Sequence, residues 1–208
     1  MSENALKDVH EKRQVIARSH HWDGRIISVV EDHVLLKAGS KPVKREYVTH
    51  PGAVAVVALR GEAGKEEILM IRQYRHPVKA FLWEIPAGLL DCVGETPVEA
   101  AQRELAEETD LAADQWNVLV EYFNSPGCST ESVRIFLAQN LHTIQTGYVR
   151  TEEEAETELR WVLLDDALRQ CLEGNIHNPS AITGIMAAYA ARSRCWADLR
   201  EANAQWMR

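Results

Sequence analysis

The sequence predicts an α/β (α+β) fold in which helices cover both faces of a mixed central β-sheet, with a small β subdomain at the N-terminus. Three observations predict this arrangement. Short β-rich segments alternate with helical segments, as in sheets flanked by helices. One segment carries a full set of helix-start signals. No stretch rich in Pro, Gly or Ser divides the chain into independent domains.

The first half of the chain contains the segments that we expect to form most of the sheet. Residues 25–36 and 43–50 have strand-like composition, and the turn-prone residues 38–42 between them predict a hairpin. Residues 53–59 form an uninterrupted apolar run, which is typical of a strand buried on both faces. Strands are also expected at residues 67–74 and 81–85, before a loop that begins at Gly88.

The clearest helix begins at Pro97. Thr96 and Glu99 have the spacing of a capping box, and proline is favoured at the first helical position, so we expect a helix over residues 97–109. Downstream, periodicity predicts strands at residues 118–123, 133–138 and 158–163 and helices at 164–173 and 180–194. We expect an N-terminal β subdomain (1–50), a main domain (51–195) and a C-terminal tail (196–208).

Composition excludes several classes of protein. A net charge of −8 argues against nucleic-acid binding through a basic surface. Every apolar run is shorter than the ~20 residues of a membrane span, so no membrane partner is expected. The charged N-terminus lacks the apolar block of a signal peptide, which predicts a cytoplasmic protein. The four cysteines form no Cys-x-x-Cys pair, so neither a zinc site nor a disulfide framework is indicated.

Three carboxylates share one face of the predicted helix. Glu104, Glu107 and Glu108 are spaced i, i+3 and i+4, which brings their side chains together. Like charges at this spacing cost only ~0.2–0.5 kcal/mol per pair, so the helix alone is also compatible with a solvated acidic face. The surrounding residues favour a functional role.

Gly88, Glu95 and the run Arg103-Glu104-Leu105-Ala106-Glu107-Glu108-Thr109-Asp110-Leu111 resemble the Nudix box, G-x5-E-x7-R-E-U-x-E-E-x-G-U, in which U is a bulky aliphatic residue. The resemblance implies a Nudix α/β/α sandwich. Two departures occur: the loop after Gly88 is one residue longer, and Asp110 replaces the last glycine. Loop length costs little, and aspartate enters the left-handed region more readily than most residues, so the helix can still end there.

The Nudix resemblance implies a metal site. Glu104 and Glu108 would be the principal ligands, Glu107 would assist a further ion, and the backbone carbonyl of Ala87 would add another oxygen. Ligands that are all oxygens favour Mg²⁺ or Mn²⁺ over zinc. Arg103 and Glu95 would support the site by orienting carboxylates.

The general base is expected in an acidic loop downstream of the box. In ADP-ribose pyrophosphatases a loop glutamate deprotonates the attacking water, and residues 152–156 hold four glutamates in the matching place. Alignment on Arg160-Trp161 favours Glu154, with Glu153 second. The remaining glutamates are expected to be solvated.

A second segment indicates the substrate specificity. Ser125-Pro126-Gly127-Cys128-Ser129-Thr130-Glu131 resembles the S-P-G-x-x-x-E segment of ADP-ribose pyrophosphatases, although Pro-Gly alone predicts only a turn. Similarity to members of the actinobacterial type extends from about Trp22 to Ala190.

This resemblance implies a homodimer with exchanged N-terminal strands. Arg45 and Glu46 would reach the adenosine pocket of the partner subunit, although an exposed charge at a strand edge is nearly as good an interpretation of Arg45. Arg75 would bind phosphate, and Ser125 and Glu131 would face the terminal ribose. We therefore expect Mg²⁺-dependent cleavage of ADP-ribose to AMP and ribose 5-phosphate. Another nucleoside diphosphate sugar or a dinucleotide is the alternative substrate, and a non-catalytic nucleotide-sensing module is the alternative class.

Overall fold

The computed structural model describes residues 6–148 and 157–208. Within these ranges, no helix has both the length and the apolar character needed to cross a membrane. The elements in chain order are β1 (Gln14–Asp23), β2 (Ser28–Leu35), β3 (Val43–Thr49), β4 (Ala53–Arg60), β5 (Glu67–Arg75), the 3-10 helix η1 (His76–Val78), β6 (Ala80–Glu84), β7 (Ala87–Leu89), α1 (Pro97–Thr109), β8 (Leu111–Phe123), β9 (Ser132–Thr143), β10 (Glu158–Leu163), α2 (Leu164–Leu172), α3 (Pro179–Ser193) and β11 (Arg200–Glu201).

The main body is built on an eight-stranded sheet. Six strands follow the order β10-β5-β4-β9-β8-β11, while β6 pairs with β5 and β7 with β4. Strands β4 and β9 are parallel, and the other pairs are antiparallel. The predicted mixed sheet is therefore confirmed.

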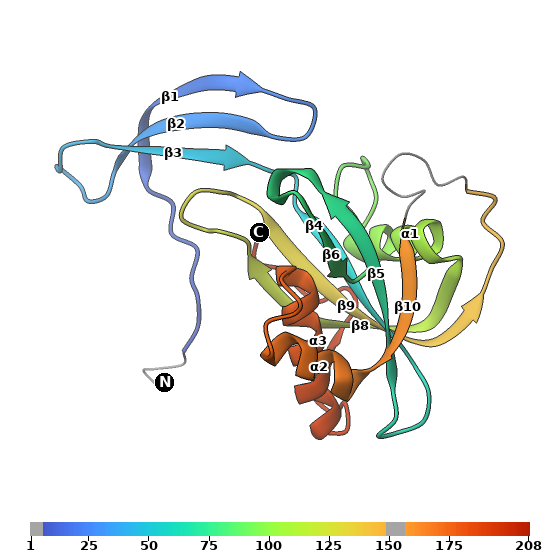
Figure 1. Cartoon of the computed structure of the whole chain (residues 1–208). Coiled ribbons are helices and arrows are strands. Elements are labelled where there is room, and N and C mark those ends of the chain that lie inside the picture. Colours follow the sequence, from blue (N-terminus) through green and yellow to red (C-terminus); the bar gives the residue numbers. More distant parts are fainter. Residues whose placement is uncertain (1–5, 149–156) are drawn as a thin grey trace.

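Helices cover both faces of this sheet (Figure 1). Val54, Val56 and Ala58 of β4 belong to the apolar cluster that contains the buried apolar residues of α1. The alternate residues of β4 belong to the cluster that contains those of α2 and α3. Because side chains alternate along a strand, an apolar residue is needed at every position when both faces are covered. This explains the uninterrupted apolar run and confirms the predicted fold class.

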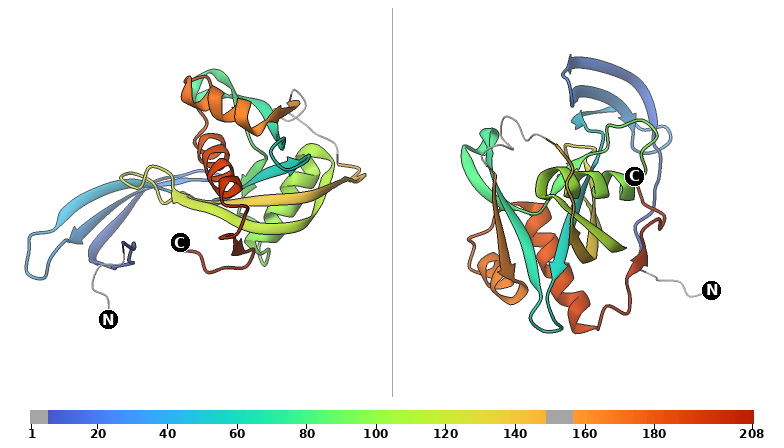
Figure 2. Two further views of the ribbon diagram at one scale, coloured as in Figure 1. Left: turned by 90° about the horizontal axis from the view of Figure 1, so that it is seen from below. Right: turned by 90° about the vertical axis from the view of Figure 1, so that its right-hand side faces the viewer.

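A separate three-stranded antiparallel sheet, in the order β1-β2-β3, stands away from the body (Figures 1 and 2). The sequence predicted only the hairpin of β2 and β3, and the absence of a third strand from that prediction was wrong. Every residue of β1 is exposed, and a strand without a buried face has no alternation to recognise. Arg18 links β1 to β2 through hydrogen bonds of 2.7 and 2.8 Å to Asp32, which also accepts one of 2.9 Å from the Tyr47 hydroxyl.

The C-terminal tail packs along the body and reaches the junction between the two sheets. Strand β11 pairs with β8, and the Arg134 guanidinium donates to the carbonyl of Ala204 over 2.8 Å. The Trp206 ring lies 4.8 Å from the guanidinium carbon of Arg134 and 5.1 Å from that of Arg208. Arg208 in turn donates to the carbonyl of Pro51 over 2.9 Å. The tail is thus held against β8, against Arg134 of β9 and against Pro51, which lies between β3 and β4.

Candidate active site

The helix α1 has defined ends, and these place its acidic face. Thr96 accepts a hydrogen bond from the backbone of Glu99, and the Glu99 carboxylate accepts one from the backbone of Thr96, so both halves of the capping box are present. The hydrogen bonds from Thr96 hold the pKa of Glu99 below its usual value. At the other end Asp110 has φ 56° and ψ 33°, which confirms the expected left-handed cap, and its N–H donates to Ala106.

The acidic face of α1 lies against strand β7. The backbone N–H of Ala87 donates to Oε2 of Glu108 over 3.0 Å. The Glu104 carboxylate lies so close to Gly88 that a Cβ on that residue would be 1.9 Å from its Cδ atom. Glu104, Glu107 and Glu108 are all half-buried. A residue without a side chain at position 88 is therefore required for this approach.

Arg103 joins the loop before the helix to the carboxylates of the helix. Its guanidinium makes two hydrogen bonds to Glu95, of 2.9 and 3.1 Å. It also donates to Glu104 over 2.6 Å and to Glu107 over 3.2 Å. The hydrogen bond to Glu95 and the nearby carboxylates raise the pKa of Arg103 further above its ordinary value. Arg103 is thus a permanent cation that orients three carboxylates.

The acidic face does not form a ready-made cage. Over residues 6–148 and 157–208, no group of three His, Cys, Asp or Glu side chains converges as metal ligands do. Glu104 bonds to Arg103, whereas Glu108 bonds to Ala87, so the two carboxylates point to different donors. The donor set is nevertheless oxygen-rich, half-buried and packed against a strand with no side chain at Gly88, and these features fit a small hard cation.

A pocket of about 520 Å³ begins at this strand. Ala87 and Gly88 line it together with Arg75 and Glu84. Arg75 makes a two-pronged contact with Glu84, with hydrogen bonds of 2.8 and 2.7 Å, and Glu84 is only 2% exposed. A guanidinium held in this way is directed before a ligand arrives, which suits recognition of phosphate oxygens.

Polar side chains from the second half of the chain also line the pocket. Glu131 lines it, and its carboxylate accepts a hydrogen bond of 2.8 Å from the Asn124 side chain, which also lines the pocket. Ser125 is exposed, with φ 56°, at the start of the turn that precedes Glu131. The turn is held against β3, because Val48 donates to the carbonyl of Cys128 and accepts from Thr130.

Several lining residues were not predicted. The Tyr122 hydroxyl lies 2.8 Å from that of Ser180 at the start of α3, and burial raises the pKa of Tyr122, so the hydroxyl keeps its proton. His50 accepts a hydrogen bond of 3.0 Å at Nδ1 from the N–H of Gly52. A backbone N–H can only donate, so the neutral ring carries its proton on Nε2. These residues come from separate elements, and no local motif connects them.

Other predicted residues lie apart from this pocket. Arg45 and Glu46 are exposed on β3, and neither lines the pocket of the same chain. The Arg45 guanidinium donates to the carbonyl of Lys44 over 2.7 Å. Glu153 and Glu154, predicted as the general base, lie outside the described residues.

Known proteins resemble this chain in sequence and in fold. A sequence model of the NUDIX domain matches residues 49–182. An ADP-ribose pyrophosphatase of Mycobacterium tuberculosis is 38% identical over 198 residues, which cover 95% of this chain and 92% of that protein. An ADP-ribose pyrophosphatase of Bacillus subtilis is 38% identical and covers 79% of this chain and 84% of its own length.

Two further similarities extend the comparison. A methanol dehydrogenase activator of Bacillus methanolicus is 34% identical and covers 84% of this chain and 91% of its own length. A crystal structure of an ADP compounds hydrolase superposes with a TM-score of 0.70, covering 90% of this chain and 98% of that one. At 19% identity, the last similarity concerns the fold alone.

Proposed function

Because this chain belongs to the NUDIX domain family, we propose that it hydrolyses ADP-ribose to AMP and ribose 5-phosphate with the help of Mg²⁺ or Mn²⁺. One observation carries the proposal: the half-buried carboxylates of α1 pack on Ala87 and Gly88, which also line a pocket that contains an oriented arginine. An acidic surface beside a guanidinium is the combination that a metal-bound diphosphate requires.

Glu104 and Glu108 would hold the cation, with Glu107 for a further ion. The N–H and C=O of one strand residue point to the same side, so the Ala87 carbonyl is directed toward the side on which its N–H meets Glu108. When bound, the cation would draw electron density from phosphorus and neutralise diphosphate charge. Arg103 and Glu95 would keep the carboxylates oriented when substrate enters.

Arg75 would bind the diphosphate within the pocket. Two hydrogen bonds to Glu84 hold its guanidinium in one orientation, and a planar guanidinium fixed in this way suits recognition of phosphate oxygens. Glu131 and Ser125 would face the terminal ribose, and the position of Glu131 in the lining of the pocket supports its role. Ser125 would approach only from the exposed turn.

The attacking water requires a base. We assign Glu154 to this role, with Glu153 as the second choice, from the sequence alone. Glu158, which follows the acidic segment, bonds to Arg160 over 2.6 Å and to Arg72 over 3.4 Å, so the start of β10 is anchored. Separate Glu154→Gln and Glu153→Gln variants test the assignment, because only the variant at the true base lowers kcat while leaving KM nearly unchanged.

The pocket would be completed by a second copy of the chain. The three-stranded sheet stands away from the body (Figure 2). Ile16 and Trp22 of β1 are 51% and 56% exposed. Exposed apolar residues on a projecting sheet are typical of an interface. Arg45 and Glu46 would then reach the partner's adenosine site. Mixing Arg45→Ala subunits with Glu108→Gln subunits tests the shared site. If each site uses Arg45 of one chain and Glu108 of the other, the mixed dimer has one intact site and hydrolysis is restored. If the mixture is only as active as the sum of the two variants, the shared site is contradicted.

A substrate screen tests the proposed function. Turnover of ADP-ribose, NADH, diadenosine polyphosphates and nucleotide sugars is compared with and without EDTA. We expect ADP-ribose to have the highest kcat/KM and EDTA to abolish turnover. A tenfold preference for another compound, on the order of 1.4 kcal/mol, would replace ADP-ribose as the substrate. Absence of turnover for every compound would favour the non-catalytic sensing module.

A further inference from the structure

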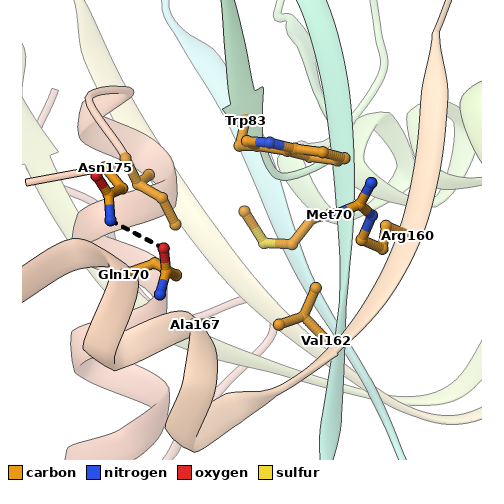
Figure 3. A pocket seen from close by; sticks show the side chains of 8 residues that line it. Met70, Trp83, Arg160, Val162, Ala167, Gln170 and Asn175 are labelled. Carbon is orange, nitrogen blue, oxygen red and sulfur yellow. Dashed lines mark hydrogen bonds between the residues drawn. The ribbon is translucent and has the colours of Figure 1, made fainter. Parts of the chain in front are cut away.

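A second pocket lies on the opposite side of strands β5 and β6 from the site described above. Its volume is about 280 Å³, and Figure 3 shows the side chains that line it. Met70 and Trp83 come from the strands, Val162 from β10, and Gln170 from α2. In Figure 3 the amides of Gln170 and Asn175 lie at the left of the pocket, and the thioether of Met70 lies below the Trp83 ring.

The two pockets share no lining residue. Trp83 and Glu84 are neighbours in β6, and neighbouring side chains of a strand point to opposite faces. Trp83 therefore lines the second pocket, while Glu84 lines the first, where it holds Arg75. A ligand in the second pocket would not occupy the proposed substrate site.

The charges at the second pocket are already balanced. The guanidinium carbon of Arg160 lies 4.8 Å from the centre of the Trp83 ring, and the same group bonds to Glu158 over 2.6 Å. The hydrogen bond from Arg160 lowers the pKa of Glu158, so the pair stays ionised. Arg72 also bonds to Glu158, over 3.4 Å, and a second carboxylate, that of Glu173, accepts a hydrogen bond from Gln170. Two guanidiniums are thus matched by two carboxylates, so the pocket has no net charge to attract an anion.

The polar side of the pocket is formed by two amides. The Asn175 amide donates to Oε1 of Gln170 over 3.0 Å, and the Gln170 amide donates to Glu173 over 3.3 Å. The Asn175 amide also donates to Glu173 over 3.4 Å. A primary amide has two N–H donors and an oxygen with two lone pairs, so Asn175 can still accept at its oxygen and Gln170 can still donate through its second N–H. Adjacent donors and acceptors of this kind complement the edge of a carboxamide or a nucleobase.

We propose that this second pocket binds a neutral, planar heteroaromatic ring that carries an amide-like edge. The flat indole of Trp83 and the polarisable sulfur of Met70 favour an aromatic ring, and the two amides would bind its polar edge. Ligand pockets usually measure about 300–1,000 Å³, so this smaller space suits one ring system and excludes a whole dinucleotide. The inference does not depend on the proposed hydrolysis.

The test compares nicotinamide with cyclohexanecarboxamide by calorimetric titration of the full chain. The two probes carry the same amide, but the saturated ring is puckered and cannot stack. We expect nicotinamide to bind measurably and the saturated probe to bind at least tenfold more weakly, which is on the order of 1.4 kcal/mol. Equal binding of the two probes, or no binding of nicotinamide, would overturn the proposal.

Three variants test whether nicotinamide binds in the second pocket. Trp83→Leu is expected to weaken nicotinamide binding by about 5- to 150-fold, the equivalent of losing one aromatic stacking contact. Gln170→Met replaces the amide with an apolar side chain of similar length and is expected to weaken nicotinamide binding. This variant tests the proposal independently if Trp83→Leu folds poorly. Gln102→Met, at an exposed position of α1, is the matched control and should bind as the unaltered chain does. If Gln170→Met leaves nicotinamide binding unchanged and ADP-ribose displaces the nicotinamide, then nicotinamide binds in the first pocket. That result would refute the proposal.

Discussion

Replacing Gly88 with alanine should separate activity from folding. The added Cβ would lie 1.9 Å from Cδ and 2.0 Å from Oε1 of Glu104, where ordinary contacts begin at 3.4 Å. The carboxylate must therefore move by roughly 1.5 Å to restore normal van der Waals separation. The group that moves is the end of a flexible side chain, so the backbone of β7 can stay in place.

This displacement affects the proposed metal ligand directly. A misplacement of ~1 Å in a reacting assembly can cost on the order of 100-fold in rate, so we expect Gly88→Ala to lose about that factor in kcat with ADP-ribose. The free energy of unfolding should change by less than ~1 kcal/mol, because the alanine restricts the unfolded chain and replaces no buried contact.

The assay pairs initial rates of ADP-ribose hydrolysis in Mg²⁺ with urea unfolding. Gly127→Ala is the matched control for stability, since a Cβ there meets nothing within 4 Å. If Gly88→Ala keeps hydrolysis within about twofold of the unaltered chain, Glu104 does not act from the position described, and the reasoning is refuted. Loss of stability well beyond that of the control would also contradict it.

Three further predictions follow from the hydrogen bonds of the site and the N-terminal sheet. Arg103→Lys removes the two-pronged contact to Glu95 and should lower kcat by about 10- to 100-fold with little change in KM, measured by steady-state kinetics. Arg75→Lys keeps the charge but loses the planar fork, so KM for ADP-ribose should rise more than kcat falls; an unchanged KM would exclude phosphate binding by Arg75. The hydrogen bond from Arg18 lowers the pKa of Asp32, so this carboxylate stabilises the fold above the ordinary value of 3.8, and that stability is lost as the pH falls below it. Unfolding midpoints between about pH 3 and pH 6 should therefore depend less on pH in Asp32→Asn, and an equal dependence would contradict the assignment.

Local signals in the sequence were sufficient to predict an element when all the residues that determine it lie within that element. The β-branched run of β4 predicted a strand covered on both faces, and the spacing of Thr96 and Glu99 predicted the start of α1, because each depends on contacts within a few residues. The same reasoning could not detect β1. That strand has no buried face, and its partners Asp32 and Tyr47 lie on other strands.

The pocket shows the same limit. Arg75 was predicted as a phosphate ligand, but its partner Glu84 was not, because the pair forms only when β5 and β6 align antiparallel. His50, Tyr122 and Ser180 come from three distant parts of the chain, and folding alone brings them to one cavity. A single sequence holds no period or spacing that connects such residues.

The most direct test of the central claim compares two charge-neutralising variants of α1. Glu108→Gln removes a proposed metal ligand, and Glu99→Gln makes the same change at an exposed position where glutamine can keep the capping box. Mg²⁺-dependent hydrolysis of ADP-ribose should fall on the order of 100-fold or more in Glu108→Gln and stay near that of the unaltered chain in Glu99→Gln. Equal, undiminished hydrolysis by both variants would show that the acidic face of α1 does not hold the cation that cleavage requires.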